Sequence, residues 1–360
     1  MDVRDFDFDL PAELIAQEPT PDRAAARLLV VRRDTGAIAH ATVAALPDLL
    51  APGDLVVVND TRVFPARLLG RRVPSGGAVE CLLIGVRDHS ETSQGGVRDD
   101  SETLWDALMH PGQKLRTGAR VIFEGPHALH GEVLDRRFFG RRLIRLWTDD
   151  GTSVDTAIDA IGHVPLPPYI KRPDRLEDRE RYQTVYARSR GSVAAPTAGL
   201  HLTRALLDAL TTRGVDIAEI TLHVGYGTFQ PVRAERVEDH RVERERYQID
   251  ESSAARINAA VDAGRRVVAV GTTTTRALEG VAHEHGGRVC AGTGETDLFI
   301  FPGFTFRIVR ALLTNFHLPR SSLLMLVSAF AGRDLILAAY REAVAQRYRF
   351  YSYGDAMLIL

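Results

Sequence analysis

Short runs of consecutive apolar residues, rich in β-branched side chains, recur along the chain and predict buried strands. They occupy residues 55–58, 217–222, 267–270 and 308–313. An apolar run of about four to eight residues, bounded by turn residues, is typical of a strand that is covered on both faces. These runs therefore indicate the interior of a sheet.

Helical patterns lie between and after these runs. One helix is predicted to begin with Thr203 as its N-cap and to end at Gly214. Its apolar face is expected to consist of Leu206, Leu207 and Leu210. Buried strands that alternate with helices predict an α/β layer fold. Further helices are expected from near Ser252 or Ser253 to Gly264, in the threonine run after Gly271, and over residues 321–331 and 334–347.

Residues 67–155 have a different pattern, with shorter runs and frequent glycine. This spacing favours a small antiparallel barrel or sandwich. Within it, residues 87–103 are polar and lack periodicity, which predicts a mobile loop. The predicted strands cover residues 67–72, 79–86, 121–123, 129–134 and 142–146.

Composition narrows the class of protein. The chain has 360 residues, enough for about two domains, and its formal net charge is −2. Because this charge gives no overall attraction to nucleic acid, any contact with RNA would depend on a local patch. The segment 171–190 is dense in charge. It is either a solvated connection or a surface that contacts RNA through Arg and Tyr side chains.

Cys81 and Cys290 are the only cysteines, too few for a disulfide framework or a zinc motif. The first ten residues are acidic and lack an apolar signal core. No stretch reaches the roughly 20 apolar residues that a membrane helix needs. We therefore expect a soluble, cytoplasmic protein without a metal site.

Polar side chains follow the first buried run, at residues 59–62. Because ligands of open α/β sheets bind at the carboxyl ends of strands, Asn59 and Asp60 are candidate binding and catalytic residues. Asp60 is expected to accept hydrogen bonds from a ribose or to act as a base. Arg62 is expected to hold a carboxylate or a phosphate. The alternative is a structural turn in which an Asp–Arg pair fixes the loop.

Two histidines stand beside glycine turns. His201 precedes the predicted helix cap Thr203, where the helix dipole disfavours the imidazolium form. His223 ends a predicted strand just before a glycine-rich turn, whose backbone N–H groups can approach a substrate closely. Both are candidates for proton transfer, and the alternative for each is a hydrogen-bonded packing residue. The neighbouring residues expected to bind substrate are Thr197, Gly199, Gly225 and Gly227.

A third group of candidates lies nearer the C-terminal end. The threonine run joins a strand to a helix, where hydroxyls and free N–H groups suit an anion, unless they only cap the helix. Asp297, Asn315 and His317 lie at the ends of predicted elements, where functional side chains converge. The threonines are Thr272, Thr273, Thr274 and Thr275.

Five segments, in the same order along the chain, resemble the S-adenosylmethionine:tRNA ribosyltransferase-isomerases of queuosine biosynthesis. The resemblance covers nearly the whole chain. It implies a β-barrel domain, residues 67–155, inserted into an α/β catalytic domain made of residues 1–66 and 156–360. The segments are residues 58–67, 192–203, 221–232, 313–319 and 350–360.

The resemblance implies a transfer in which S-adenosylmethionine is consumed as a substrate and no cofactor takes part. Its ribosyl part is joined to 7-aminomethyl-7-deazaguanine at the tRNA wobble position, giving epoxyqueuosine, adenine and methionine. A base must remove a ribose 5′ hydrogen that the sulfonium acidifies, and an electrostatically tuned pocket must assist the later steps. We expect a monomer. The candidates for proton transfer are Asp60, His201, His223, Asp297 and His317.

Two other functions stay open on the sequence alone. A methyltransferase that uses S-adenosylmethionine would release S-adenosylhomocysteine and no adenine. A non-catalytic tRNA-binding protein would leave S-adenosylmethionine intact. The clusters of His, Asp and Gly favour an enzyme, because RNA binding alone relies mainly on Arg, Lys and aromatic side chains.

Overall fold

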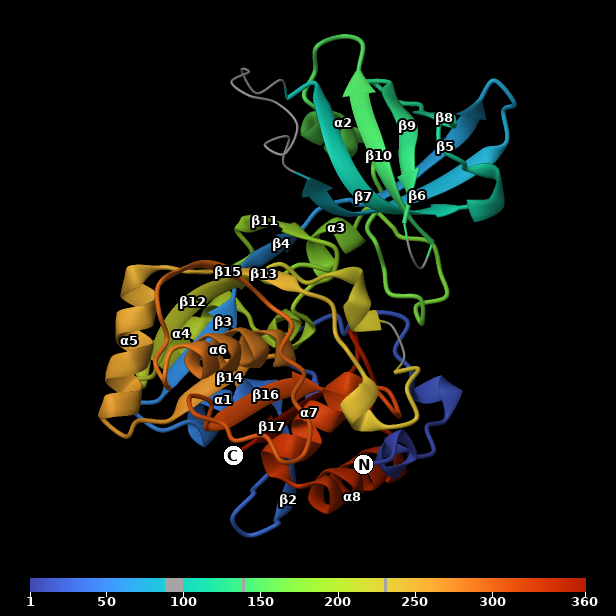
Figure 1. The fold of residues 1–360 in the computed structure, drawn as a ribbon. Helices are drawn as coiled ribbons and strands as arrows, with labels where there is room; N and C mark the ends of the chain where they lie inside the picture. Colours follow the sequence, from blue (N-terminus) through green and yellow to red (C-terminus); the bar gives the residue numbers. More distant parts are fainter. Residues whose placement is uncertain (88–99, 138–139, 230–231) are drawn as a thin grey trace. The chain divides into compact units, whose positions relative to one another are not determined.

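The chain folds into two compact units. A computed structural model describes residues 1–87, 100–137, 140–229 and 232–360. The larger unit contains residues 1–62, 167–173 and 181–360, and the smaller unit contains residues 63–166 and 174–180. The larger unit is an α/β unit and the smaller one contains a closed β-barrel (Figure 1), so the predicted fold class is confirmed.

A nine-stranded mixed sheet organises the larger unit. Its central strands β12, β3, β14 and β16 are parallel, and the C-terminal strand β17 is antiparallel to β16 and parallel to β1. The strands lie in the order β15 (Gly292–Thr296), β13 (Glu245–Ile249), β12 (Asp216–Leu222), β3 (Leu55–Asn59), β14 (Val267–Val270), β16 (Ala311–Asn315), β17 (Ala356–Ile359), β1 (Arg27–Val31) and β2 (Ile38–Thr42).

Helices cover both faces of this sheet. Leu55 and Val57 of β3 belong to the core that contains residues of α5, α6, α7 and α8, whereas Val56 and Val58 belong to the core that contains residues of α1 and α4. Successive side chains of a strand point to opposite faces, so an uninterrupted apolar run fits a strand that is buried on both sides. Figure 1 shows α6 across the near face of β3 and β14. The helices are α1 (Leu46–Leu49), α4 (Arg204–Thr212), α5 (Glu251–Asp262), α6 (Thr272–Glu284), α7 (Ser322–Ala331) and α8 (Arg333–Ala345).

Short elements complete the larger unit. Strand β11 (Ser189–Ser192) pairs with β4 (Thr61–Val63) in a separate two-stranded sheet, and the division of the sequence into units falls within helix α3 (Asp178–Arg181), of which residues 178–180 belong to the smaller unit. The 3-10 helices are η1 (Val3–Phe6), η2 (Ala12–Leu14), η3 (Val43–Ala45), η7 (Thr197–His201), η8 (Tyr226–Phe229) and η9 (Val237–Asp239).

Helix boundaries follow the capping chemistry. Thr203 is the N-cap of α4, as predicted, and its side chain accepts a hydrogen bond from the N–H of Leu206. Helix α5 begins at Glu251, within two residues of the predicted start near Ser252 or Ser253. Its N-cap is Asp250, whose carboxylate accepts the N–H of Ser253 at 2.6 Å.

The predicted strand 308–313 also differs from the structure, because β16 begins only at Ala311. The N–H groups of Ile308 and Val309 donate to the buried Glu279 carboxylate of α6, at 3.0 and 2.8 Å. These two residues therefore bind a side chain instead of joining the sheet.

The smaller unit is built on a six-stranded antiparallel barrel. Along these strands, buried side chains alternate with more exposed ones. Leu68, Cys81, Phe123 and Ile144 are among the buried side chains that form the barrel core. Strand β7 was not predicted, and the described ends of the predicted loop 87–103 belong to strands, with Arg87 in β6 and residues 102–103 in β7. Residues 88–99 of that loop lie outside the described residues. The strands follow one another as β10 (Arg141–Thr148), β7 (Glu102–His110), β6 (Ala78–Arg87), β5 (Arg67–Val73), β8 (Arg120–Phe123) and β9 (Leu129–Arg136), with α2 (Val154–Ile161) and the 3-10 helix η5 (Gly112–Lys114) beside them.

In the described part of the chain, no single helix combines the length and the apolar content of a membrane span. Helices α7 and α8 meet these limits only when they are taken together, and they are bent by 116° relative to each other.

Candidate functional site

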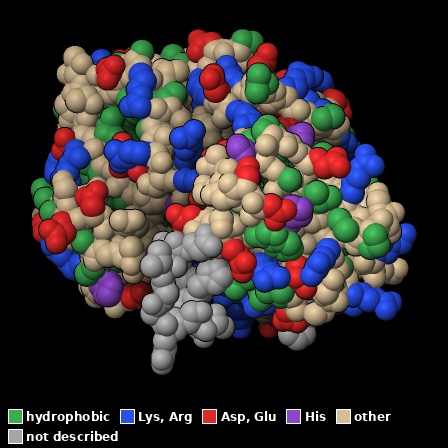
Figure 2. All heavy atoms as spheres, turned by 90° about the horizontal axis from the view of Figure 1, so that it is seen from above, with side chains coloured by type: hydrophobic (Ala, Val, Ile, Leu, Met, Phe, Trp, Pro, Cys, Tyr) green, Lys and Arg blue, Asp and Glu red, His purple; other side chains and the backbone are tan. Residues whose placement is uncertain are grey.

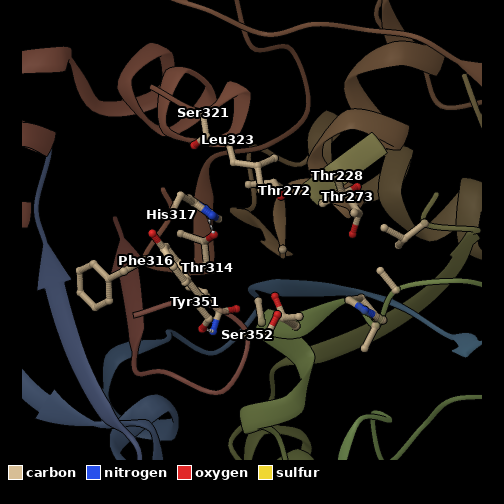
Figure 3. A pocket seen from close by; sticks show the side chains of 18 of the residues that line it. Thr228, Thr272, Thr273, Thr314, Phe316, His317, Ser321, Leu323, Tyr351 and Ser352 are labelled. Atoms are coloured by element: carbon tan, nitrogen blue, oxygen red, sulfur yellow. Dashed lines mark hydrogen bonds between the residues drawn. The ribbon is translucent and has the colours of Figure 1, made fainter. Parts of the chain in front are cut away.

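A cavity that opens to solvent lies in the larger unit, at the carboxyl ends of β14 and β16. This is where open α/β sheets place their ligands. Its wall is mainly apolar, with a few polar groups from widely separated segments, which is typical of a small-molecule site. Figure 3 shows Thr272 and Thr273 on one side of the cavity and His317 and Thr314 on the other. The polar lining residues are Thr197, Thr228, Thr272, Thr273, Thr314, Asn315, His317, Ser321 and Ser352.

The N-terminus of α6 faces this cavity. Gly271 has a φ of 93°, a left-handed conformation that favours glycine, and no described side chain caps the helix. Thr274 and Thr275 turn their hydroxyls back to the carbonyls of Val270 and Gly271. The threonine run is therefore divided between cavity-facing and backbone-bound side chains.

The cavity-facing half of the run suits an anion. Thr272 and Thr273 line the cavity, and Thr273 Oγ1 is buried without a hydrogen-bond partner among the described residues. The first N–H groups of a helix carry the positive end of its dipole. Free N–H groups and one free hydroxyl thus point to a carboxylate or phosphate at this end of the cavity.

Asn315 presents a fixed amide at the same cavity. Its Nδ2 donates to the carbonyl of Tyr351 and to Nε2 of His201, both at 3.1 Å. Because a carbonyl only accepts hydrogen bonds, the amide orientation is determined. Asn315 Oδ1 consequently faces away from both and has no partner among the described side chains and backbone groups. It is available to accept a hydrogen bond from a ligand.

The same contact defines the state of His201. Its Nε2 accepts from Asn315, so the neutral ring carries its proton on Nδ1. Burial, together with Arg349 and Arg23, lowers the pKa of His201 to about 4. His201 does not line the main cavity. Its geometry is that of a group that orients Asn315.

His317 lies in the cavity wall. Its backbone N–H donates to the hydroxyl of Tyr340 at 2.9 Å, and its Nε2 is 2.8 Å from Thr314 Oγ1. Burial lowers the pKa of His317 to about 3. At neutral pH the ring is therefore an uncharged hydrogen-bonding group and a weak base.

His223 belongs to a second network, at the end of β12. Its Nδ1 is 2.8 Å from Thr61 Oγ1, which is in turn 2.8 Å from Ser192 Oγ. The ring is only partly buried. Burial lowers the pKa of His223, and the nearby Asp60 carboxylate opposes this shift. His223 does not line the cavity, but the next residue, Val224, does.

Asn59 and Asp60 connect strands. The Asp60 carboxylate accepts from Thr221 Oγ1 at 2.6 Å and from the Arg188 guanidinium at 3.0 Å. The Asn59 amide pairs with the backbone N–H and C=O of Leu222. Both side chains thus tie β3 to its neighbours. An Asp–Arg pair fixes the loop, as the structural alternative supposed, but the arginine is Arg188.

The remaining candidates lie apart from the cavity lining. Asp297 is exposed, with a carboxylate oxygen 3.3 Å from Arg244 Nε. Arg62 is exposed as well. The structure therefore brings together only some of the predicted residues, and the others have local partners. Those that line the cavity are Thr197, Thr272, Thr273, Asn315 and His317, whereas Gly199, Gly225 and Gly227 do not.

A buried ion pair supports one wall and was missed by the sequence analysis. Glu245 of β13 and Arg276 of α6 are 2.5 Å apart, and both are almost fully buried. Glu245 Oε1 also accepts the N–H of Gly225 at 3.0 Å, and Arg276 Nε donates to the carbonyl of Leu298 at 2.9 Å. Glu245 stands in a run of alternating charges that reads as a solvated strand, so no sequence signal identified it.

The buried histidines predict a loss of stability in acid. The unfolded chain protonates histidine near pH 6.5, whereas folded His317 resists protonation down to about pH 3. Stability from this group is thus complete above pH 6.5 and falls as the pH drops towards 3. We expect His317→Asn to reduce the slope of unfolding free energy against pH by up to about 1.4 kcal/mol per pH unit below pH 6. Denaturant unfolding at pH 7, 6 and 5 gives the free energy of unfolding at each pH, and therefore the slope.

The matched control is His285→Asn, which changes an exposed histidine. It should keep the wild-type slope. The slopes of unfolding free energy against pH are compared because His317→Asn also changes packing. A change in packing shifts the whole free-energy curve without altering its dependence on pH. Parallel curves for His317→Asn and the wild type would contradict the expectation.

Charges on the molecule are mixed. On the face drawn in Figure 2, acidic and basic side chains of the described residues are interspersed. Within the described ranges, no group of three or more His, Cys, Asp or Glu side chains is placed to hold a metal ion.

Comparisons with known proteins give consistent results. Residues 3–359 match the family model described as queuosine biosynthesis protein. The chain is 52% identical over 360 residues to the S-adenosylmethionine:tRNA ribosyltransferase-isomerase of Symbiobacterium thermophilum, with both chains covered completely. It is 51% identical to that of Geobacter sulfurreducens, with 99% of each chain covered. The crystal structure of S-adenosylmethionine tRNA ribosyltransferase from Thermotoga maritima has 37% sequence identity and a TM-score of 0.54, covering 99% of this chain and 100% of that one.

Proposed function

Because the chain belongs to the queuosine biosynthesis protein family, we propose that the cavity at the carboxyl ends of β14 and β16 is the S-adenosylmethionine site of a tRNA ribosyltransferase-isomerase. The chain has this enzymatic role, and neither the methyltransferase nor the non-catalytic alternative is supported by the comparisons. The finer assignments below, including a cytoplasmic monomer without a cofactor, are proposals.

The observation that carries the proposal is the N-terminus of α6. S-adenosylmethionine is a small cation with one carboxylate, and the Thr272 and Thr273 end of the cavity supplies N–H groups and a free hydroxyl for that carboxylate. Asn315 Oδ1 offers an acceptor for a hydroxyl or amino group of the same molecule. Tyr169 and Tyr351 give the wall an aromatic part for the adenine, with ring centroids 4.6 Å apart.

His223 is the proposed base among the five candidates, and because only its neighbour Val224 lines the cavity, the proposal requires the bound ribose to extend from the cavity towards the His223 ring. A base needs a pKa not far below the working pH, and burial lowers the pKa of His317 to about 3 and of His201 to about 4. The His223 ring is only partly buried, and the negative charge of Asp60 stabilises its imidazolium form. Partial exposure also allows the ring to return its proton to solvent.

The chemistry follows from this arrangement. His223 removes one ribose 5′ hydrogen made acidic by the sulfonium, and the electron pair that is left expels adenine as the ribose ring opens. The amine of the aminomethyl group of the tRNA base then adds to the vinyl sulfonium and gives up a proton, and the carbanion formed beside sulfur attacks the aldehyde left by adenine loss, which closes the carbon ring and leaves an alkoxide to displace the sulfur. Methionine departs as the epoxide closes. Asn315 and His317, both neutral, hold the substrate during these steps.

Two variants of the threonine run test the site. Wild-type enzyme should release adenine and methionine in equal amounts when it is given tRNA that carries the deazaguanine precursor. Thr273→Val removes a cavity-facing hydroxyl, and we expect about a tenfold weaker affinity for S-adenosylmethionine, because a hydrogen bond to a charged group contributes about 1.5–3 kcal/mol. Calorimetry measures the affinity, and chromatography the products.

Thr275→Val is the matched control, since it removes a hydroxyl that bonds only to the Gly271 carbonyl. Its affinity should stay within about twofold of the wild type, because the change leaves the cavity lining intact. Equal affinities of all three proteins would mean that the carboxylate binds elsewhere. Formation of S-adenosylhomocysteine would contradict the reaction itself.

A further inference from the structure

A second, smaller cavity in the larger unit has a different chemical character. It is a shallow hollow, open to solvent, and is lined by Arg23, Arg181, His201 and Thr20, among other residues. None of the described residues that line it is acidic. Two guanidinium groups therefore share one hollow without a carboxylate in its wall.

Carbonyl groups hold these arginines in place. Arg181 donates from Nη1 to the carbonyl of Pro21 at 2.9 Å and from Nη2 to the carbonyl of Thr20. Arg23 donates from Nη1 to the carbonyls of Gln183 and Leu200, at 2.8 and 3.0 Å. Carbonyl dipoles orient a guanidinium but do not neutralise its charge, so the cavity keeps a positive potential.

The electrostatic surroundings agree with this view. Burial, and then repulsion by Arg181, lowers the pKa of Arg23. Asp355, which follows the lining residue Gly354, is buried and accepts the N–H groups of Arg27 and Arg349. Its carboxylate is 3.8 Å from the Arg349 guanidinium, so this acid serves a neighbouring arginine.

The smaller cavity lies next to the proposed S-adenosylmethionine site. Ser352 lines both cavities, and His201 in the smaller one bonds to Asn315 in the larger one. Arg181 belongs to the charge-rich segment 171–190, which the sequence left open between a solvated connection and an RNA contact. A ligand held by Arg181 would thus lie one side chain away from the proposed S-adenosylmethionine site.

We propose that the cavity lined by Arg23, Arg181 and His201 binds a phosphodiester group of the tRNA substrate. Guanidinium groups present paired N–H donors that match phosphate oxygens, and Thr20 and Ser352 add hydroxyls to the wall. The carboxylate of S-adenosylmethionine already has its partner at α6, which leaves the RNA backbone as the anion for this second cavity. The inference rests on the proposed function in taking tRNA as the substrate and in placing the S-adenosylmethionine carboxylate at α6.

The experiment uses the whole protein and a tRNA transcript. Arg181→Gln removes the charge but keeps hydrogen-bond donors. We expect about 5–20-fold weaker tRNA binding near 100 mM salt, and a slope of log affinity against log salt that is smaller by about 1, because one phosphate contact is lost. Affinity for S-adenosylmethionine should not change. Inorganic phosphate should compete with tRNA on the wild type and compete less on Arg181→Gln.

Two further variants separate charge from structure. Arg181→Lys keeps the charge and should retain most of the tRNA affinity, even though lysine cannot reproduce both carbonyl contacts. Arg213→Gln, which changes an exposed arginine paired with Asp48, should keep the wild-type affinity and salt slope. Fluorescence anisotropy across a salt series measures all four proteins.

Two outcomes would overturn the proposal. The first is a wild-type affinity and salt slope for Arg181→Gln, including the case in which inorganic phosphate binds but tRNA binding is unaffected. The second is an equal loss in Arg181→Gln and Arg181→Lys, because the arginine would then act only as a clamp for residues 19–21. Failure of the proposed function is recognised separately, as intact tRNA binding without release of adenine.

Discussion

Replacing Glu245 by alanine should lower the free energy of unfolding by about 3–5 kcal/mol, because it leaves the Arg276 guanidinium buried without its counter-charge. Glu245 is 4% exposed and Arg276 is 9% exposed as side chains, so water does not replace the lost carboxylate. One Arg276 nitrogen, Nη2, already lacks a partner among the described residues. Equilibrium unfolding in urea measures the loss, which should appear as a lower midpoint.

A double variant and a surface pair serve as controls. Glu245→Ala combined with Arg276→Met removes both charges and should be more stable than Glu245→Ala alone, since no isolated charge remains. Arg288→Ala breaks an exposed pair with Asp262 and should cost less than about 1 kcal/mol. If Glu245→Ala cost no more than Arg288→Ala, the buried pair would not stabilise the fold as argued.

The ion pair also links stability to the cavity. Glu245 holds the N–H of Gly225, and the turn that starts there carries Thr228, which lines the cavity. Arg276 is on the same helix as Thr272 and Thr273. One pair therefore connects the glycine-rich turn to the helix end that is proposed to bind the carboxylate.

Local signals predicted much of the α/β unit. The run at residues 267–270 coincides with β14, and Thr203 caps α4 as its chemistry requires. Such features depend on neighbours within a few residues. Strand β17, which is as short as β14, was not predicted, and its place in the sheet is defined by pairing with β16 and β1. Its partners in β1 lie more than 300 residues away in the sequence.

The site shows the same division. The residue types at Thr273, Asn315 and His317 marked them as candidates, and the structure places all three in the cavity lining. The direction in which each side chain points could not be predicted from the sequence. Whether a threonine faces the cavity or its own helix depends on the backbone around it, as the contrast with Thr274 shows.

The state of His201 depends on a partner distant in sequence. The hydrogen bond that makes its Nε2 an acceptor comes from Asn315, 114 residues further along the chain. No periodicity records such a contact. The residue type and position of His201 therefore suggested a catalytic base, whereas its hydrogen bond shows a group that orients Asn315.

Replacing His223 by asparagine should reduce the chemical step by about 10²–10⁴-fold while affinity for S-adenosylmethionine is largely kept, because proton transfer contributes rate and not ground-state binding. Asparagine preserves a polar contact with Thr61, which the histidine makes through Nδ1, and removes the second ring nitrogen. Single-turnover release of adenine measures this step. S-adenosylmethionine deuterated at both ribose 5′ positions adds a second measurement, since wild-type product should have lost one label to the base and solvent.

His201→Gln is the comparison that distinguishes a base from an orienting residue. Glutamine extends an amide oxygen towards the place of Nε2, so it still accepts from Asn315, and turnover should stay within about tenfold of the wild type, the change expected for an imperfect hydrogen bond. His201→Ala leaves that donor without a partner and should mainly weaken substrate binding. Retention of both deuterium labels in wild-type product would exclude proton abstraction altogether. If His201→Gln loses more activity than His223→Asn, and His223→Asn remains active, then the assignment of the base to His223 is wrong and His201 is the better candidate.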